Sequence, residues 1–371
     1  MAPALIPDLP AGVQLLYLAE GGANIVYRML LPSVDLATSS EIKHNGDGTP
    51  RQTEIEDPAQ ATLLEGKLLR LRKDVEYGIP YQQTARNFDK HIRPLFKPEE
   101  LVDQRLVRLP AGLVHRCNEQ LRASERKGKR PAKRHGVYLS TAEHFGLLVT
   151  DMTDANDLET TVAELKPKWL LQSPSAPPNA KRCRTCALRE MKNHEARQAG
   201  LKEEQSFCPL DLVSDKREDV LRAVRFIKGC SDQHRLAKVL YQNRTLLKLR
   251  DYQRKMNDVG RARHPAHSSE MSLAMTLRDC TMFIKVGQMI LFSLRRHAAN
   301  RTQMPSDDKR PIEVRLGDLD LKTAAGGKAE YWLDIENRLI EGGWYAGEGP
   351  CQGHSECALQ GARREVPRLM Q

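Results

Sequence analysis

Acidic residues near the end of the chain stand where apolar strands are expected, and a metal-dependent reaction could take place there. Asp318 and Asp320 alternate with leucines in RLGDLDLK, which we expect to lie on a strand over 312–322. Asp279 stands between a helical pattern and the apolar strand expected over 280–286. Mg²⁺ usually takes one or two protein carboxylates together with substrate phosphates. For a lone acid near a strand end, a helix cap or a surface salt bridge is the alternative.

Two lysines lie close together in the segment ELKPKW, within a strand expected over 161–171. On a strand, Lys166 and Lys168 would point to the same face, and Pro167 would interrupt the pairing. Neighbouring ammonium groups repel each other, so an anion beside them would explain the arrangement. An exposed edge strand that carries lysines against aggregation would explain it equally well.

A basic segment follows over 172–192. Arg184, Leu188 and Lys192 are spaced by four residues, so a helix that begins here would place both cations on broadly the same side. A helix face exposed to solvent is the alternative interpretation.

The same segment holds Cys183 and Cys186, whose spacing suggests a shared role. A structural zinc site would need two more ligands, and His194 and Cys208 are the nearby candidates. A second closely spaced pair is missing. We therefore favour the interpretation that these cysteines are reduced and merely pack in the protein, and not the zinc site.

A glycine-rich tip, Gly21-Gly22-Ala23-Asn24, joins two short strand patterns at 13–17 and 25–31. Its backbone N–H groups have little side-chain obstruction, as a loop that covers a phosphate chain requires. A hairpin turn without a ligand is the alternative. Taken together, the covering loop, the lysines and the carboxylates are the components of phosphoryl transfer.

These residues must be positioned by an α+β fold with two lobes. We expect an N-terminal β-rich lobe over 1–150 and a larger α/β lobe over 151–371, with Asp154 and Asn156 in the polar connection between them. Residues 33–60 are expected to form a mobile insertion, and 122–135 a basic loop too charged to pack. The expected strands lie at 67–73, 136–140 and 145–150, and the expected helices at 113–121, 216–228, 234–250 and 270–278, with a short one around Leu101, Leu106 and Val107.

Composition supports a folded protein with an anionic partner. The 58 Lys and Arg exceed the 48 Asp and Glu by ten, and 40% hydrophobic content excludes wholesale disorder. The longest apolar stretch, 282–294, contains Lys285 and Gln288, so we expect no membrane span. We find no secretory signal pattern, and expect a monomer located in the nucleus, the cytoplasm or both.

The chain resembles the inositol-pentakisphosphate 2-kinases, in particular their fungal branch. The resemblance rests on EGGANIVYR, ELKPKWLLQSP, RCRTCALR, CPLDL, YQNR, LRDC and GDLDLK, which occur in the family's order. It implies a fold similar to protein kinases and a reaction in which ATP phosphorylates the 2-hydroxyl of inositol pentakisphosphate, giving inositol hexakisphosphate.

The resemblance also implies roles for single residues. Asp279 would be the catalytic base, and Lys166 would contact the nucleotide and support catalysis. Asp318 would bind Mg²⁺, with Asp320 as a second ligand. ATP would further contact Gly21, Gly22, Ala23, Asn24, Arg70 and a hinge over 149–152 that includes Val149 and Asp151. The inositol phosphates would contact Lys168, Arg184, Arg189, Lys192, Asn243 and Lys322.

The sequence departs from the family at three places. Leu188 stands where plant and animal members have a histidine. The plant Cys/His zinc cluster is not visible before Asp279, where His264 and His267 occur. After Lys322, TAAGGKAEYW replaces the usual basic and aromatic stretch, so Lys328 and Tyr331 are the candidate substitutes.

Two alternatives stay open at this point. One is a nuclear nucleic-acid-binding protein that uses the basic segment 122–135, which would then also be a nuclear-localisation tract. The other is an inactive family member that only binds inositol phosphates.

Overall fold

The computed structural model describes residues 5–30, 63–153, 160–257, 259, 269–287, 312–322, 328–348 and 356–359. The chain divides into two compact units, each of which is described by itself. Unit 1 comprises Met1–Arg86 and Asp103–Asp151, and unit 2 comprises Asn87–Val102 and Met152–Gln371. The segment Asn87–Val102 therefore packs with unit 2, although it lies within the first 150 residues. The insertion expected over 33–60, and Asp154 and Asn156, lie outside the described residues.

Unit 1 is built on an antiparallel sheet with the strand order β1-β2-β3-β5-β4. Residues alternate along β2, so that Ile25 and Tyr27 are buried against the core while their neighbours are partly exposed. The core is completed by α3, whose Leu113, Cys117 and Leu121 face the sheet. The elements of this unit are β1 (Gln14–Glu20), β2 (Asn24–Leu30), β3 (Lys67–Arg72), α2 (Tyr81–Asn87), β4 (Gln104–Arg108), α3 (Leu113–Arg126) and β5 (Phe145–Thr150).

The predicted hairpin of β1 and β2, the strand β3 and the strand β5 are confirmed. The helix expected around Leu106 and Val107 is wrong, because these residues form β4, which pairs with β5 and buries Val107 completely. The strand expected at 136–140 is also wrong, since only Leu139 makes an isolated bridge, to Lys73. At 104–108 tertiary pairing with β5 overrides weak local preference.

The basic segment 122–135 is more ordered and more buried than expected. Helix α3 continues to Arg126, past its last apolar residue. Arg130 is only 4% exposed and donates two hydrogen bonds of 2.9 Å to the carboxylate of Glu20, and it also pairs with Glu125. Most of the segment is exposed, as expected, but the prediction that it is too charged to pack is wrong for Arg130, because buried acids compensate this arginine.

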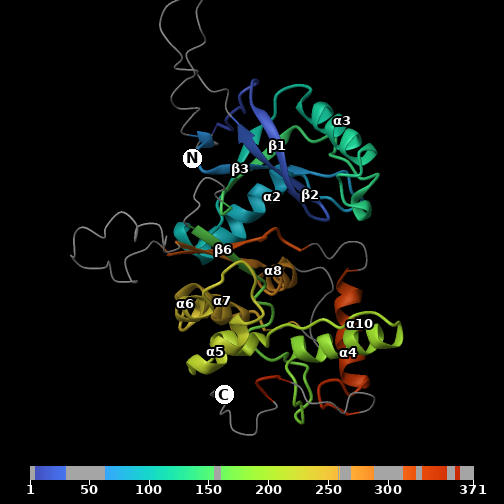
Figure 1. The fold of residues 1–371 in the computed structure, drawn as a ribbon, viewed down its shortest axis with the longest axis vertical. Coiled ribbons are helices and arrows are strands. Elements are labelled where there is room, and N and C mark those ends of the chain that lie inside the picture. The colour runs from blue at the N-terminus through green and yellow to red at the C-terminus, as the bar shows by residue number, and fades with distance from the viewer. Residues whose placement is uncertain are drawn as a thin grey trace, which may run out of the picture. The chain divides into compact units, whose positions relative to one another are not determined.

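Unit 2 contains a three-stranded antiparallel sheet in the order β6-β7-β8, surrounded by helices. Its strands are β6 (Thr160–Leu165), β7 (Thr281–Gly287) and β8 (Ile312–Gly317). Its helices are α4 (Arg184–Gln198), α5 (Arg217–Val224), α6 (Gln233–Leu240), α7 (Arg244–Lys255), α8 (Ser269–Leu277) and α10 (Lys328–Glu341), with a 3-10 segment η5 (Pro209–Val213). In Figure 1, α4 (green) and α10 (red) lie side by side, in agreement with their contacts.

Two strands of unit 2 are shorter than expected. The strand predicted over 161–171 ends at Leu165, and the one predicted over 312–322 ends at Gly317. Pro167 cannot donate to a ladder, and Asp318 adopts a left-handed backbone with φ of 54°. Lys166, Lys168, Asp318 and Asp320 therefore lie beyond the strands on which we expected them.

The helix predicted over 234–250 is two helices, α6 and α7. They are separated at Tyr241–Asn243, where Gln242 has a positive φ. The mixed α+β class is confirmed. Among the described residues, no helix is long and apolar enough to cross a membrane.

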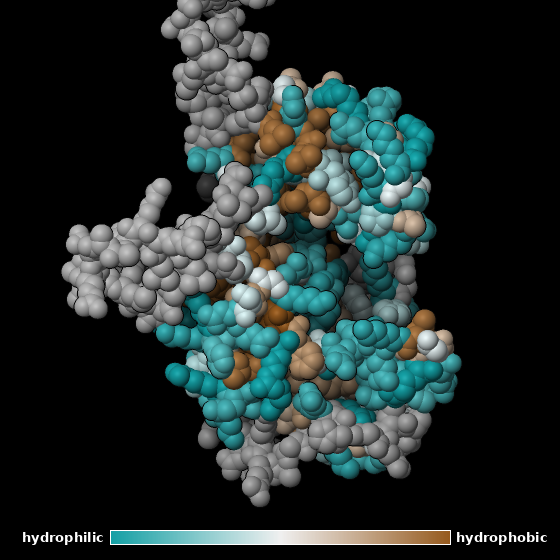
Figure 2. Space-filling model, in the orientation of Figure 1, coloured by the Kyte–Doolittle hydropathy of each residue, from teal (hydrophilic) through white to brown (hydrophobic). Residues whose placement is uncertain are grey.

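The surface is largely hydrophilic on the face shown in Figure 2, with hydrophobic side chains gathered over β1 and β2. The exposed apolar side chains of β1 include Leu16, which is 56% exposed, and Leu18.

Candidate functional site

Three loops of unit 2 meet at one end of its sheet and carry the acidic and basic residues singled out above. The pairing places Leu165 opposite Met282, and Thr281 opposite Gly317. In an antiparallel sheet, the residues that follow β6 and β8 and those that precede β7 emerge at the same end. This topology brings Lys166, Asp279 and Asp318 together, although Lys166 is more than 100 positions away from either acid in the sequence.

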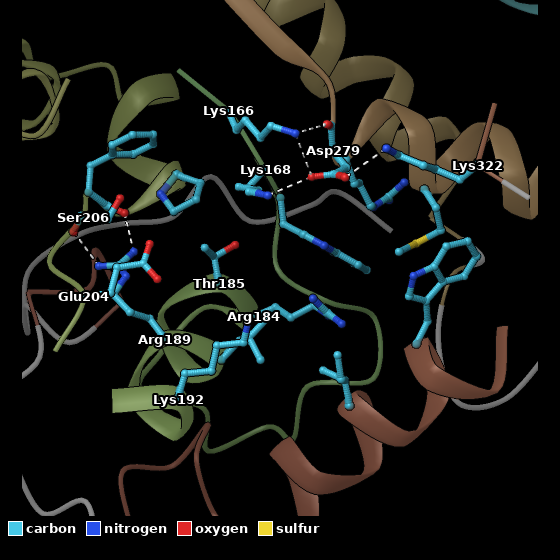
Figure 3. Close-up of a pocket in the computed structure, with 18 of the residues that line it drawn as sticks. Lys166, Lys168, Arg184, Thr185, Arg189, Lys192, Glu204, Ser206, Asp279 and Lys322 are labelled. Carbon is cyan, nitrogen blue, oxygen red and sulfur yellow. Dashed lines mark hydrogen bonds and ion pairs between the residues drawn. The ribbon is translucent and has the colours of Figure 1, made fainter. Parts of the chain in front are cut away.

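Asp279 is surrounded by three lysines (Figure 3). Lys168 Nζ lies 2.8 Å from Asp279 Oδ1, and Lys322 Nζ lies 3.1 Å from Asp279 Oδ2. Lys166 Nζ lies 3.6 Å from Asp279 Oδ1 and donates to Asp318 Oδ2 at 3.0 Å. The predicted base and the lysines expected to contact phosphates therefore form one cluster.

The lysines set the protonation state of Asp279. Burial by itself would raise the pKa of this carboxyl, but the hydrogen bond from Lys168 and the charges of Lys322, Lys168 and Lys166 outweigh burial and lower the pKa to about 2. Burial would lower the pKa of Lys166, but Asp318 and Asp279 raise it above its ordinary value. Near neutral pH Asp279 is therefore deprotonated and Lys166 is protonated.

A cavity of about 610 Å³ opens beside Asp279, within unit 2. Among the residues that the structure describes, Asp279 and Glu204 are the acids that line it. Seven cationic side chains also line it: Lys166, Lys168, Arg184, Arg189, Lys192, Arg278 and Lys322. Seven cations and two acids leave a net charge of five positive units, so the cavity is suited to a small polyanion.

Helix α4 supplies one wall of the cavity through Arg184, Arg189 and Lys192, as Figure 3 shows. The predicted spacing by four residues is confirmed, because Arg184, Leu188 and Lys192 all line the cavity. Lys192 is exposed, whereas the Arg189 guanidinium donates to the carbonyl groups of Ser206 and Phe207. Arg189 therefore joins α4 to the opposite stretch of chain.

Arg184 is held by a buried network that the sequence did not indicate. Its Nε donates to Glu336 Oε2 of α10 at 2.7 Å, and Glu336 also accepts from Ser173 and Tyr345. Its guanidinium lies 4.4 Å from the centre of the Trp169 ring. Such contacts fix the orientation of a guanidinium while leaving its charge on the cavity wall.

Arg278 also lies over the Trp169 ring, at 4.6 Å from the ring centre. It is 2% exposed and donates to the carbonyl groups of Ala274 and Gln253. Burial, together with the charge of Arg184, lowers the pKa of Arg278 to about 9. In the sequence, only its position directly before Asp279, in LRDC, indicated that Arg278 would lie at the site.

Gln253 of α7 links the two segments that carry Lys168 and Asp279. Its amide group donates to the backbone carbonyls of Lys168 and Leu277, both at 2.9 Å, and its side-chain oxygen accepts from the N–H of Leu170 at 2.9 Å. The residue is fully buried. A glutamine inside a helical pattern carries no distinctive signal, so the sequence gave no reason to select it.

The backbone is strained at two points of the cluster. Lys168 and Asp318 have φ of 57° and 54°, in the left-handed region that non-glycine residues rarely adopt. Strain of this kind persists where the surrounding structure determines the conformation, and it is common at functional sites. In these backbone conformations the side chain of Lys168 points to Asp279 and that of Asp318 points to Lys166. A strand conformation would point them elsewhere.

The remaining residues expected at unit 2 sites do not line the cavity. Asn243 caps α7, since its side-chain oxygen accepts from the N–H of Leu246 at 3.1 Å. The carboxylate of Asp318 is half exposed and borders the cavity through Lys166. The backbone carbonyl of Asp320 accepts from Thr276, whose hydroxyl also receives the N–H of Lys322 at 2.9 Å.

Apart from Lys166, the single residues expected to contact ATP lie in unit 1. The tip is tied to β3, because Lys73 donates its N–H to the Ala23 carbonyl and its ammonium group to the Gly21 carbonyl. The space next to Gly21 and Gly22 is open, with no atom within 4 Å of an added Cβ.

Asn24 and Arg70 are connected through Tyr81. The Tyr81 hydroxyl donates to Asn24 Oδ1 at 3.0 Å, and the Arg70 guanidinium lies 5.6 Å from the Tyr81 ring centre. Val149 lies in β5, and the N–H of Asp151 donates to the Gly66 carbonyl at 2.8 Å.

Comparison with known proteins gives a consistent result. The sequence model of the family described as "Inositol-pentakisphosphate 2-kinase" matches residues 17–232 and 226–338. A protein of that name from Yarrowia lipolytica is 30% identical over 199 residues, which are 53% of this chain and 57% of that protein. One from Debaryomyces hansenii is 25% identical over 335 residues, covering 74% of this chain and 85% of that protein. Because the family match covers most of the chain, including the cavity, this chain belongs to the inositol-pentakisphosphate 2-kinase family.

Proposed function

We propose that this protein transfers the γ-phosphoryl group of ATP to the 2-hydroxyl of inositol pentakisphosphate, producing inositol hexakisphosphate. The observation that carries the proposal is the position of Asp279 at the edge of a cavity lined by seven cations. Five phosphates carry roughly −8 to −10 charges at about −1.5 to −2 each. A cavity that lacked several cations could not hold such a ligand.

The cations have different parts in this proposal. Arg184 is fixed by Glu336 and Trp169, and we assign it a phosphate contact that needs little reorganisation. Lys168 and Lys322 now pair with Asp279. In the complex their ammonium groups would move to substrate phosphates, which releases the carboxylate for the hydroxyl group. Lys192, which is exposed, would contact an outer phosphate.

Asp279 would orient the 2-hydroxyl and accept its proton. In the reaction, the 2-oxygen forms a bond to the γ-phosphorus while the bond from that phosphorus to the β,γ-bridging oxygen breaks, and ADP leaves. The pKa of this carboxyl is about 2 while the lysines pair with it, and their departure would raise the pKa toward its ordinary value, at which a carboxylate is still a weak base. Weak basicity suits a phosphoryl transfer in which positioning and charge neutralisation supply most of the rate enhancement.

The residues present fit a magnesium ion. Asp318 offers a half-exposed carboxylate, a hard oxygen ligand, next to Lys166. We propose Asp318 as a ligand and Asp320 as a second one. When bound, Mg²⁺ would neutralise charge on the transferring phosphate.

For ATP we propose the residues of unit 1: Gly21, Gly22, Ala23, Asn24, Arg70, Val149 and Asp151, together with Lys166. The support is the open tip over Gly21 and Gly22 and the connection of Asn24 and Arg70 through Tyr81. We further propose that the two units correspond to the two lobes of a kinase-like plan.

The test is to incubate the purified protein with MgATP and inositol 1,3,4,5,6-pentakisphosphate and to follow both products. We expect ADP and inositol hexakisphosphate in equal amounts, resolved by anion-exchange chromatography. Binding of the inositide without any ADP would instead identify a non-catalytic binder. Absence of both binding and turnover would contradict the proposal.

The nucleic-acid alternative is weakened by one observation. Arg130, at the centre of the basic segment, is buried and paired with Glu20, so its charge is not presented to a partner. Salt-dependent binding of duplex DNA that is lost when the exposed Lys127 and Lys129 are replaced would favour that alternative.

A further inference from the structure

Arg278 is a buried arginine at the cavity whose charge no carboxylate balances within the described part of the chain. It is 2% exposed and lines the cavity. Its guanidinium donates to neutral oxygens: the carbonyls of Ala274 at 3.0 Å and Gln253 at 2.8 Å, and the side-chain oxygen of Asn257 at 3.2 Å. Among the described residues, its buried Nε finds no hydrogen-bond partner.

Arg278 shares the ring of Trp169 with Arg184. The two guanidinium groups lie 4.6 Å and 4.4 Å from the ring centre. Among the described residues, Glu336 is the one acid that pairs with either of them, and it pairs with Arg184. Burial and the charge of Arg184 both lower the pKa of Arg278, so the two cations repel each other. The pair therefore leaves one positive charge unbalanced beside the cavity.

A structural role accounts for part of this arrangement. Ala274 lies in the last turn of α8 and Gln253 in the last turn of α7, so Arg278 satisfies carbonyl groups at the C-terminal ends of two helices. Such helix ends attract cations. The effective cost of burying one ion nevertheless exceeds what helix ends contribute. An anion in the cavity would offset the remainder.

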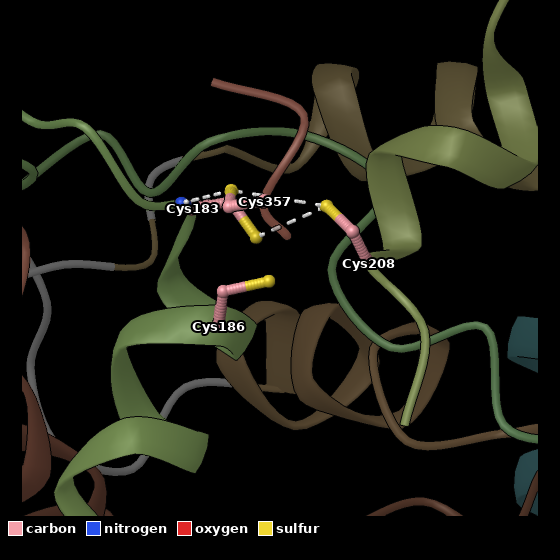
Figure 4. Close-up of side chains that lie close together, drawn as sticks. All are labelled: Cys183, Cys186, Cys208 and Cys357. Carbon is pink, nitrogen blue, oxygen red and sulfur yellow. Dashed lines mark hydrogen bonds between the residues drawn. The ribbon is translucent and has the colours of Figure 1, made fainter. Parts of the chain in front are cut away.

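The backbone that carries Arg184 is held in place by packing. Cys183, directly before it, belongs to a cluster of four free, buried cysteines from three segments of unit 2 (Figure 4). Their sulfur atoms lie within 4.8 Å of one another. Of the residues considered with this pair from the sequence, Cys208 belongs to the cluster, whereas the ring of His194 packs against Trp344. The cluster consists of Cys183, Cys186, Cys208 and Cys357.

We propose that Arg278 is a specificity-determining residue, which forms one phosphate subsite with Arg184 beside Trp169 and selects inositides that carry a phosphate there. This inference rests on the proposed function and adds a residue to it. Arg184 would contact the phosphate. Arg278 would attract it through charge where little water screens the interaction, since Trp169 is 6% exposed. A ligand with a hydroxyl group at that position would leave the charge of Arg278 unbalanced.

Arg278 differs from the lysines around Asp279 in what the binding of a ligand costs. Lys168 and Lys322 pair with Asp279 in the free protein, so a phosphate has to replace a carboxylate there. Arg278 gives up no carboxylate of the described structure, and its hydrogen bonds to the helix carbonyls can stay in place. Arg278 should therefore contribute more to affinity than its share of the cavity cations indicates.

The test measures how the effect of Arg278 depends on the phosphates of the ligand. Wild type, Arg278→Met and Arg278→Lys are titrated by calorimetry with inositol pentakisphosphate and with the inositol tetrakisphosphates that each lack one of its phosphates. Arg278→Met should bind the pentakisphosphate about 10- to 100-fold more weakly. Arg278→Lys keeps the charge and should recover most of the affinity. For the tetrakisphosphate that lacks the phosphate of this subsite, wild type and Arg278→Met should bind alike.

Two results would overturn the proposal. One is an equal loss for every ligand in Arg278→Met, because a purely structural effect does not depend on which phosphate is absent. The other is the same loss in Arg278→Lys, because the charge would then have no part in binding. If Arg278→Met does not fold, Arg278→Gln, which keeps an amide donor for the helix carbonyls, takes its place with the same outcomes.

Arg182→Met is the matched control. Arg182 is 1% exposed in unit 2 and is not among the described residues that line the cavity. Its replacement should lower the stability of the fold and leave the ranking of the ligands unchanged. The same change of ranking in Arg182→Met as in Arg278→Met would also contradict the role of Arg278.

The two proposals fail differently. No binding of inositol pentakisphosphate by the wild type would contradict the proposed function. Tight binding by the wild type, combined with an equal loss for every ligand in Arg278→Met, would contradict the role of Arg278 alone.

Discussion

The ammonium group of Lys168 lies 2.8 Å from the carboxylate of Asp279, and the backbone of Lys168 is left-handed where it makes this contact. The pair unites a residue assigned to the inositol phosphates with the residue assigned to proton transfer. One ammonium group cannot pair fully with a carboxylate and a phosphate at the same time. We therefore expect substrate binding to be coupled to the loss of the contact between Lys168 and Asp279, and we expect the bound polyanion to replace this contact.

Replacement of Asp279 by asparagine separates catalysis from binding. We expect kcat to fall by about 10²–10⁴ because the proton acceptor is lost. We also expect inositol pentakisphosphate to bind at least as tightly, because the cavity loses one of its two acids and Lys168 and Lys322 lose their competitor. Steady-state kinetics and calorimetry measure the two effects. Unchanged kcat, or clearly weaker binding of the inositide, would contradict the roles given to Asp279.

Lys168 allows charge and backbone strain to be tested at one position. Lys168→Gly and Lys168→Ala should weaken inositol pentakisphosphate binding equally, since both remove the ammonium group. The glycine variant should be more stable than the alanine variant by about 1 kcal/mol, because glycine adopts a positive φ without steric cost. Calorimetry and urea denaturation supply the two readouts, with the exposed Lys90→Ala as a charge-matched control. Equal stability of the two variants would show that the left-handed backbone is not a strain.

Sequence reasoning selected many of the residues that lie together at the cavity, but not the geometry that brings them together. The hairpin, β3, β5 and most helices follow local patterns that a sequence displays directly. Asp279 was correctly placed between a helix and a strand.

Other features depend on tertiary contacts. The burial of Arg130 requires Glu20, which lies 110 positions away, and the convergence on Asp279 requires the order of β6, β7 and β8. The sequence pattern put Lys168 and Asp318 on strands, because it does not show that both residues adopt left-handed conformations beyond the strand ends.

Gln253 should act as a positioning residue. Gln253→Leu would leave the carbonyls of Lys168 and Leu277 and the N–H of Leu170 without their buried partner. Each such group costs about 1–3 kcal/mol, so urea denaturation should show a large loss of stability.

Kinetics of folded Gln253→Leu can show whether Gln253 only stabilises the fold or also positions Lys168 and Asp279 for the reaction. Under conditions where Gln253→Leu remains folded, we expect KM for the inositide to rise more than KM for ATP. The exposed Gln233→Leu is the matched control and should change neither. Equal changes in both KM values would indicate that Gln253 only stabilises the fold.

The buried ion pairs around Glu20 make the stability of unit 1 depend on pH. Burial alone would raise the pKa of Glu20, but the hydrogen bonds from Arg130 and Lys73 outweigh it and lower the pKa from 4.5 to about 2. A carboxyl whose pKa is lower in the folded state stabilises the fold above its unfolded pKa. That contribution is therefore present above about pH 4.5 and is lost as the pH falls toward 2.

Glu20→Gln tests this dependence directly. At pH 7 the variant should be less stable by about 3–5 kcal/mol, because Lys73 and Arg130 keep buried charges without their partner. The difference between wild type and variant should shrink between pH 4.5 and pH 2.5, because Glu20 then becomes protonated in the wild type. Urea denaturation followed by circular dichroism measures it, with the exposed Glu119→Gln as control. A difference that stays constant over this range would mean that the carboxylate charge of Glu20 does not stabilise the fold, since neutralising it by acid would then have no effect.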